Sequence, residues 1–473
     1  MLAKALMVGG TASGVGKSWM TTAICAWLRR RGVRVAPFKA QNMSNNSYPC
    51  SGGGEIGRAQ VAQAEACGLE PTVDMNPILL KPTGDTGSQV VVQGKVWRNL
   101  QAREYYDYFD YLLSKVEESY HRLASQYDFI VMEGAGSIAE INLRRTDLVN
   151  LGLATRLNVP VLLVADIDRG GVFASVYGTL ALLPPNEASL VRAFAVNRFR
   201  GDPSLFANGV AMLQERTERP CLGVFPYTRE IQLDEEDGVM FDTWQPKPKG
   251  APSIAILEFP HVSNITDFRL LTWANRVHRP VRSQFDVVIL PGSKNTIADL
   301  NWMRAQGLDL WVHQQHANGA RVIGICGGYQ ILGDRIDDPF EMESGQRSAS
   351  GLGLLPVTTT LLREKVTQSV TATTLNGHRF SAYEIHMGQT VASSQLEPFA
   401  NVEGRNEGVQ LGTVSGTYLH GALEDPGVVE EWLGFRPPVT ASKQQSYEQI
   451  ADWFEQSADT GLFEKLFLTD SDS

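Results

Sequence analysis

The sequence predicts an α/β protein with two doubly wound domains. Short apolar runs alternate with helix-length amphipathic segments, a pattern typical of a parallel sheet covered on both faces. The alternation breaks at residues 244–252, where three prolines and a glycine favour a linker, and then it restarts. Because 473 residues exceed what one core usually organises, we expect residues 1–243 and 253–440 to form separate domains.

Apolar runs of strand length, bounded by polar turn residues, supply the expected strands. Those of the first domain are Ala3–Val8, Val33–Phe38, Phe129–Met132, Val159–Ala165 and Val191–Val196. Those of the second domain are Ser253–Glu258, Val287–Leu290 and Arg321–Ile325. We expect helices over Trp19–Arg31 and around Ser446–Phe467, the latter in a C-terminal segment, residues 441–473, whose acidic end frays.

The composition excludes several classes of function. Apolar residues make up 43% and charged residues 20%, the mixture of an ordinary globular protein. A formal net charge of −10 argues against a nucleic-acid partner, which needs a basic face. No apolar run approaches the roughly 18 residues of a membrane helix, so we expect no membrane partner. Five cysteines without CxxC spacing and a start without a cleavage site indicate a cytoplasmic protein.

A glycine-rich loop, Gly9–Ser18, follows the first predicted strand and leads into the first predicted helix. Glycines let backbone N–H groups converge on phosphate oxygens, and the helix N-terminus adds positive potential. Thr11 stands where the strict P-loop pattern has glycine, so the loop resembles the variant of the dethiobiotin synthetase group. The alternative is a glycine turn that binds nothing. The residues expected to bind ATP are Thr11, Gly14, Val15, Gly16, Lys17 and Ser18.

Two polar residues at strand ends extend this nucleotide site. Phe129–Met132 delivers Glu133 at its C-terminal end, where a carboxylate can bind Mg²⁺ together with the hydroxyl of Ser18. Asn197 follows another buried run and stands where related enzymes read the adenine edge. A surface acid and a turn-forming asparagine are the respective alternatives.

A second reactive motif, Arg321–Gln330, favours a strand, a sharp turn and a helix, with Cys326 at the turn. Glycines on both sides permit the strained elbow that projects a nucleophile, whereas a quietly buried thiol is the alternative. The N–H of Gly327 and the backbone of Gly292–Ser293 can form an oxyanion site. His420 is the candidate base, because the other histidines lie in polar or unrelated contexts.

These segments resemble class I glutamine amidotransferase domains. The resemblance implies a catalytic pair, Cys326 and His420, that forms a glutamyl thioester and releases ammonia from glutamine. The chain departs from the family at Ala422, where an acid normally follows the histidine. Glu424 is a candidate to orient His420 in its place.

Longer segments are similar to the cobyric acid synthase family, and together they cover almost the whole chain. They are Phe38–Ser47, Glu55–Ala64, Asn76–Pro82, Asp166–Phe173, Pro291–Leu300 and Tyr383–Gly388. The resemblance implies a glutamine-hydrolysing carbon–nitrogen ligase of cobalamin biosynthesis. Its reaction would be amidation of the b, d, e and g carboxylates of adenosylcobyrinic acid a,c-diamide, through acyl phosphates made with ATP and Mg²⁺. Phosphate is a far better leaving group than hydroxide, so ATP fits the chemistry.

The second protein ligand of Mg²⁺ is left open by the sequence. Related dethiobiotin and a,c-diamide synthetases carry an acid after the second strand, where this chain has Gln41 and Asn42. Asp166 and Asp168, at another strand end, are candidates, and turn formation is the alternative for them.

Two other functions remain open at this point. One is cobyrinate a,c-diamide synthase or a related ligase with the same two domains. The other is a non-catalytic P-loop switch that carries a degenerate amidotransferase module for binding. Retention of both Cys326 and His420 argues against the switch, because a binding module has no need of a thiol elbow.

Overall fold

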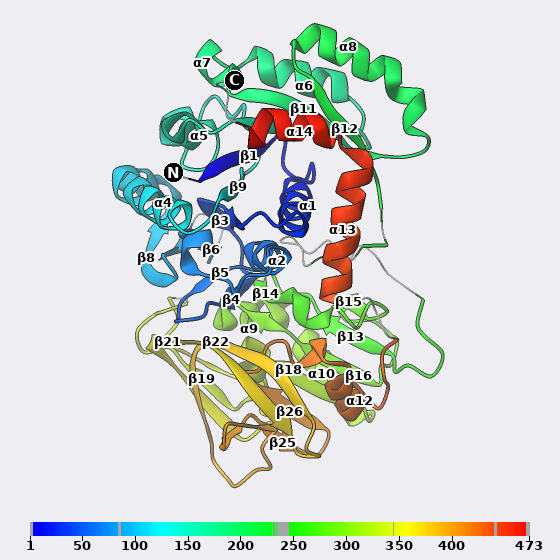
Figure 1. Cartoon of the computed structure of the whole chain (residues 1–473). Helices are drawn as coiled ribbons and strands as arrows, with labels where there is room; N and C mark the ends of the chain where they lie inside the picture. The colour runs from blue at the N-terminus through cyan, green and yellow to red at the C-terminus, as the bar shows by residue number, and fades with distance from the viewer. Residues whose placement is uncertain are drawn as a thin grey trace.

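A six-stranded parallel sheet, in the order β12-β11-β10-β1-β9-β2, forms the centre of the N-terminal domain (Figure 1). The strands are β1 Lys4–Gly10, β2 Val35–Phe38, β9 Phe129–Glu133, β10 Val161–Asp166, β11 Val191–Phe199 and β12 Cys221–Pro226. The first five overlap the runs predicted from the sequence. The computed structural model describes residues 3–83, 87–228, 230–231, 233, 246–343, 345–438 and 442–469.

Successive residues of the central strand β1 point to opposite faces of this sheet, and both faces are buried. Leu6 and Val8 pack into the core under helix α1, while Ala5 and Met7 pack into the core on the other side. The helices are α1 Lys17–Arg30 on the first face, and α4 Phe109–Ala124, α5 Leu151–Leu157, α6 Val172–Ala181 and α8 Ala207–Thr217 on the second. Burial of both strand faces confirms the doubly wound prediction.

A β-rich insertion, which the sequence did not predict, follows β2. Its four-stranded sheet contains β3 Gln41–Met43, β6 Ile78–Pro82, β7 Gly87–Val92 and β8 Lys95–Gln101. A short antiparallel pair, β4 Ser47–Pro49 with β5 Glu55–Gly57, leads into helix α2 Arg58–Ala66. The insertion contacts the C-terminal domain, for example through the hydrogen bond that the Ser47 N–H donates to Asn264 Oδ1.

The C-terminal domain is built on a second six-stranded sheet, in the order β15-β13-β16-β18-β26-β25. Its strands are β13 Ile254–Leu257, β15 Asn275–Val277, β16 Val287–Leu290, β18 Arg321–Ile325, β25 Val409–Leu411 and β26 Val414–Thr417, with only β25 antiparallel to its neighbour. Its helices are α9 Thr296–Ala305, α10 Leu308–Ala317, α11 Gly327–Leu332 and α12 Pro426–Leu433. The three strands predicted here are confirmed.

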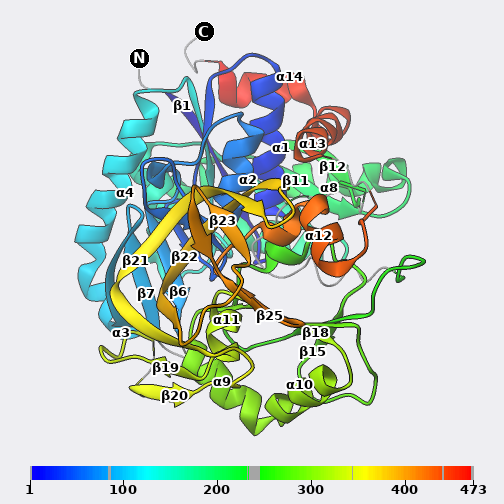
Figure 2. The ribbon, with the colours of Figure 1, turned by 90° about the horizontal axis from the view of Figure 1, so that it is seen from below.

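Two long antiparallel strands, β21 Val357–Thr374 and β22 Arg379–Ala392, form a further sheet with β19, β20, β23 and β24 (Figure 2). The bounds of the shorter strands are Arg335–Asp337, Ser348–Ser350, Ala400–Val402 and Arg405–Glu407, in that order. Strand β22 lies against β4 of the N-terminal insertion, where the rings of Tyr48 and Tyr383 are 4.7 Å apart. This sheet therefore reaches across to the other domain.

The predicted C-terminal helix is present, but it ends at Ser457 instead of near Phe467, and it packs against the N-terminal domain. Helix α13 spans Lys443–Ser457, and Asp459 then caps the short helix α14, Thr460–Phe463. Figure 1 shows α13 running beside α1 of the N-terminal domain. Phe454 lies 5.3 Å from the ring of Trp27. The C-terminal helices thus complete the apolar core around α1.

The predicted linker lies partly outside the described residues, because Trp244 and Gln245 are not among them. Residues 246–252 contain neither helix nor strand, as the prolines predict. In the described part of the chain, no helix combines the length and apolar character needed to cross a membrane.

Candidate active sites

The glycine-rich loop connects β1 to α1 and lies at the C-terminal edge of the first sheet. Gly14 and Gly16 have φ values of 70° and 94°, which favour glycine. A Cβ at position 16 would stand 2.1 Å from the side-chain nitrogen of Asn197, so no other residue fits there. Lys17 is buried, and its Nζ donates to the carbonyls of Ala12, at 3.0 Å, and Gly136, at 2.8 Å. Carbonyls of the loop and of the segment after Glu133 thus hold the Lys17 ammonium in place. A glycine-rich loop with a lysine held beside it is the arrangement that binds phosphate.

Glu133 lies beside this loop, as predicted. The Ser18 hydroxyl donates to its Oε1 at 2.8 Å, and Lys39 Nζ lies 3.0 Å from the same oxygen. The amide of Gln63, on α2, donates to Oε2. Burial alone raises the pKa of Glu133, but the Lys39 ammonium and these hydrogen bonds outweigh it and lower the pKa. The carboxylate is ionised at neutral pH, and with the Ser18 hydroxyl it offers hard oxygen ligands that suit Mg²⁺.

Asn197 lies at the back of the loop, where its Nδ2 donates to the carbonyl of Val15 at 2.9 Å. It is 3% exposed. In this structure the amide supports the loop, and a contact between Asn197 and adenine stays a prediction.

The candidates for a second Mg²⁺ ligand are occupied by other partners. Asp166 Oδ2 accepts from Arg198 at 3.1 Å, and Asp168 Oδ2 accepts from Arg200 at 3.0 Å. The Asn42 amide donates to Gln60 at 2.9 Å. Among the residues described, no cluster of three or more His, Cys, Asp or Glu side chains forms a metal cage. Proteins hold Mg²⁺ at a nucleotide through one or two carboxylates together with phosphate oxygens and water.

Cys326 lies at a strained turn between β18 and α11. Its φ of 51° and ψ of −107° are unusual for a residue with a side chain, and they mark the predicted nucleophile elbow. A Cβ at Gly328 would stand 2.0 Å from the carbonyl oxygen of Leu290, so the tight turn requires glycine there. The Cys326 side chain contacts the Ile385 carbonyl, with Sγ 3.6 Å from the oxygen.

His420 is fully buried next to this elbow. Its Nδ1 lies 2.7 Å from Oδ2 of Asp267, so the nitrogen left for proton exchange is Nε2. Nε2 has no hydrogen-bond partner within the described structure. Burial lowers the pKa of His420, but the Asp267 carboxylate and then Cys326 outweigh it and raise the pKa to about 10. The ring is therefore an imidazolium at neutral pH, a cation in the electrostatic environment of Cys326.

Asp267, which sequence reasoning missed, orients the histidine. It lies in the 3-10 turn Ile265–Phe268, 153 positions before His420. Its second oxygen accepts from the N–H of Gly421 at 2.7 Å, so both carboxylate oxygens are held. No local spacing signals such a pairing, because the two residues meet only through the fold.

Glu424, the candidate that the sequence offered for orienting His420, has other partners in the structure. Its carboxylate instead accepts from Arg58 of the N-terminal domain at 3.2 Å and lies 3.1 Å from Arg269. Glu424 stabilises the contact between the domains. Because Arg58 is on α2 together with Gln63, this helix contacts Glu133 at one end and the segment after His420 at the other.

The predicted oxyanion residues lie together at the elbow. A Cβ on Gly327 would stand 2.8 Å from the backbone nitrogen of Ser293, and one on Gly292 would stand 3.1 Å from the His420 ring. The backbones of Ser293 and Gly327 therefore approach each other beside Cys326. Their N–H groups suit an oxyanion that develops at this point.

We expect Asp267→Asn to lower the rate of glutamine hydrolysis, the activity that the resemblance to class I glutamine amidotransferases implies, by about 10²-fold, since a neutral amide no longer stabilises the imidazolium. Asparagine has one oxygen for the two contacts that Asp267 makes, so thermal unfolding is measured alongside to show that the variant is folded. Release of ammonia from glutamine measures the effect. Glu424→Gln is the matched control, and an equal loss in that variant would contradict the assignment of Asp267.

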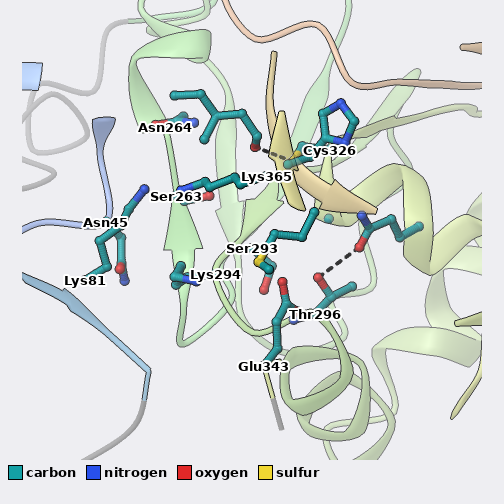
Figure 3. Close-up of a pocket in the computed structure, with 15 residues that line it drawn as sticks. Asn45, Lys81, Ser263, Asn264, Ser293, Lys294, Thr296, Cys326, Glu343 and Lys365 are labelled. Atoms are coloured by element: carbon teal, nitrogen blue, oxygen red, sulfur yellow. Dashed lines mark hydrogen bonds between the residues drawn. The ribbon is translucent and has the colours of Figure 1, made fainter. Parts of the chain in front are cut away.

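A cavity next to Cys326 lies between the two domains (Figure 3). Figure 3 shows Asn45 and Lys81 entering from the N-terminal domain, opposite Cys326. The domains also meet through a hydrogen bond that the backbone N–H of Ser47 donates to the side-chain oxygen Oδ1 of Asn264 at 3.0 Å. The thiol site is thus accessible from a space that both domains line.

Comparisons with known proteins agree with this division of the chain. Residues 6–239 match the model of the CobQ/CobB/MinD/ParA nucleotide binding domain, and residues 253–428 match that of the CobB/CobQ-like glutamine amidotransferase domain. A cobyric acid synthase of Methylorubrum populi is 43% identical, with 96% of each chain covered. Those of Streptococcus sanguinis and Syntrophobacter fumaroxidans are 41% and 42% identical, with 97% and 98% of each chain covered.

Proposed function

The chain belongs to the cobyric acid synthase family, and from this premise we propose how its residues divide the reaction. It is a glutamine-dependent ligase with a P-loop domain for ATP, and it acts on a corrinoid. The proposed substrate is adenosylcobyrinic acid a,c-diamide, amidated at its b, d, e and g carboxylates. We assign residues 1–243 to the synthetase domain, 244–252 to the linker, 253–440 to the amidotransferase domain and 441–473 to the C-terminal helix and tail.

Glutamine hydrolysis takes place in the C-terminal domain. The Cys326 thiolate attacks the side-chain carboxamide carbon, and the N–H groups of Ser293 and Gly327 stabilise the oxyanion. His420 gives its proton to the departing ammonia, while Asp267 holds the ring at 2.7 Å. Water then hydrolyses the thioester to glutamate and restores the sulfur.

Carboxylate activation takes place at the P-loop. A corrinoid carboxylate oxygen attacks the γ-phosphorus of ATP, and ADP leaves. Lys17 and the loop N–H groups neutralise the charge that develops on the phosphate oxygens. The Ser18 hydroxyl and the Glu133 carboxylate would hold Mg²⁺, which supplies further neutralisation when bound. Ammonia then attacks the acyl carbon, and phosphate leaves.

One observation carries the proposal: a complete Cys–His–Asp arrangement and a closed P-loop occur in one chain, and both domains line the cavity beside the thiol. A non-catalytic switch would need no buried imidazolium beside a strained cysteine. The five cysteines are all free thiols, which supports a cytoplasmic location for the enzyme.

Product mass tests the proposed substrate. The protein is incubated with adenosylcobyrinic acid a,c-diamide, MgATP and glutamine, and each added amide lowers the product mass in one fixed step. Four added amides are the expected result. An unchanged mass, together with two added amides on cobyrinic acid in a parallel incubation, would favour the a,c-diamide synthase instead.

A further inference from the structure

The short turn that carries Asp267 is held by the N-terminal domain. The backbone N–H of Ile265, at the start of this turn, donates to Asn46 Oδ1 at 3.2 Å, and Ser47 donates to the residue just before it. The carbonyl of Asn46 accepts from the backbone N–H of Arg58 at 3.0 Å. One segment of the insertion therefore fixes both the turn of Asp267 and the first residue of α2.

Arg58 reaches from α2 to the residues around His420. It is 2% exposed, and Figure 1 shows α2 at the boundary between the two domains. Its guanidinium carbon lies 4.8 Å from the ring centre of Tyr48 and 5.9 Å from that of Tyr383. Its Nη2 donates to Glu424 Oε1 at 3.2 Å. A planar guanidinium suits both kinds of contact, because it stacks on aromatic rings and also donates to carboxylates.

Tyr383 connects Arg58 to the histidine. The rings of Tyr383 and His420 are stacked, with their centres 5.3 Å apart and their planes 22° from parallel. The two residues also exchange backbone hydrogen bonds of 3.0 Å and 2.9 Å. Asp267 holds the edge of the same imidazole at Nδ1. The position of the imidazole thus depends on a contact at its face and a contact at its edge, and the N-terminal domain holds the partner in each.

We propose that Arg58 is a positioning residue for His420, supplied across the boundary between the domains. Arg58 holds the Tyr383 ring against the face of the imidazole, while the segment before β4 holds the turn of Asp267. The inference rests on the proposed hydrolysis of glutamine, and it adds the N-terminal domain to the groups that this reaction needs. Arg58 acts through the alignment of the histidine and not through contact with glutamine.

Replacement of Arg58 with methionine tests this role. Arg58→Met should lower kcat for glutamine hydrolysis by about 10- to 100-fold and leave KM within about twofold, because a misaligned histidine impairs proton transfer more than binding. Methionine keeps an unbranched stem against the two tyrosine rings. Release of ammonia from glutamine gives both constants. Amidation with ammonium salts should continue near the wild-type rate, which shows that the variant is folded.

Arg98→Met is the matched control. Arg98 also belongs to the insertion, and its guanidinium carbon lies 4.8 Å and 5.0 Å from the ring centres of Trp97 and Tyr108. Its hydrogen bond to the Tyr108 hydroxyl, at 2.8 Å, stays within the N-terminal domain. Loss of a stacked arginine there should change neither kcat nor KM for glutamine. An unchanged kcat in Arg58→Met as well would overturn the proposal.

A double variant separates positioning of the histidine from a general structural role. In Asp267→Asn the imidazole has already lost its orienting charge, so adding Arg58→Met should lower kcat by less than about threefold further. If the two losses multiply instead, Arg58 acts independently of the histidine, and the proposal is wrong. Arg58→Lys keeps the charge without the planar stack and should recover only part of the rate.

Tyr383→Leu decides if Arg58→Met loses amidation with ammonia as well. Tyr383 belongs to β22 of the C-terminal domain, so its replacement leaves α2 intact. The leucine variant should lose kcat for glutamine as Arg58→Met does, whereas Tyr383→Phe, which keeps the ring, should hydrolyse glutamine normally. A wild-type kcat in Tyr383→Leu would refute the inference. Absence of ammonia release from glutamine in the wild type would refute the proposed function instead.

Discussion

Replacement of Cys326 with alanine should abolish glutamine-supported amidation, while amidation with ammonium salts continues. The variant removes the sulfur that forms the covalent adduct, so we expect a loss of at least about 10⁴-fold with glutamine. Lys17 and Glu133 belong to the other domain, and the contacts of Lys17 with Gly136 and of Ser18 with Glu133 do not involve Cys326. Product mass, measured with each nitrogen source at saturating MgATP, gives both rates.

Cys221→Ala is the matched control for this experiment. Cys221 is a free thiol at the start of β12, on the N-terminal sheet, and should be dispensable with either nitrogen source. Equal loss of both nitrogen sources in Cys326→Ala would show that the cysteine supports the fold or the ATP-dependent step. The division of labour between the domains would then be incorrect.

The sequence predicts the two reactive loops well because each is a local motif. In Gly9–Ser18 and in Arg321–Gln330, the strand, the turn and the helix follow one another directly, so the spacing of glycines already determines the geometry. The positive φ values that the motifs require occur at Gly14 and Gly16 in the first turn and at Cys326 in the second. The doubly wound sheets follow from equally local evidence, since each central strand is a short apolar run.

The partners of these residues are less predictable because they come from distant parts of the chain. Asp267 lies on a short 3-10 turn with no periodic pattern, and only the packing of that turn against the segment after His420 makes it a partner. Glu424 is nearer to His420 in the sequence, but its carboxylate accepts a hydrogen bond from Arg58 of the other domain. Sequence proximity is a weak guide when a buried interface competes for the same carboxylate.

The C-terminal helix illustrates the same limit. Its amphipathic pattern predicts a helix, yet the pattern does not say which surface covers its apolar face. Phe454 and Trp453 of α13 pack against Trp27 of α1 and Phe225 of β12, more than two hundred residues earlier in the chain. The helix packs there because the apolar side chains of α1 and β12 form a surface that α13 covers.

Replacement of Lys17 with methionine should lower amidation by about 10³-fold with glutamine and with ammonia alike, because the phosphate oxygens lose their nearest cation. Methionine keeps most of the buried stem, so the loop should retain its packing. The contacts to Ala12 and Gly136 are made by the ammonium, and their loss leaves two carbonyl oxygens to accept from water. Product mass with both nitrogen sources measures the loss.

The informative companion measurement is glutamine hydrolysis without a corrinoid. Lys17 is remote from the Cys326–His420–Asp267 arrangement, so Lys17→Met should still release ammonia from glutamine at a rate near that of the wild type. Lys95→Met, an exposed lysine of the same domain, should affect neither activity. Should Lys17→Met amidate normally with ammonia, the loop would not be the site of carboxylate activation. Loss of glutamine hydrolysis as well would show that the two sites are coupled. Helix α2 would then be the element to test, because it contacts both Glu133 and the segment after His420.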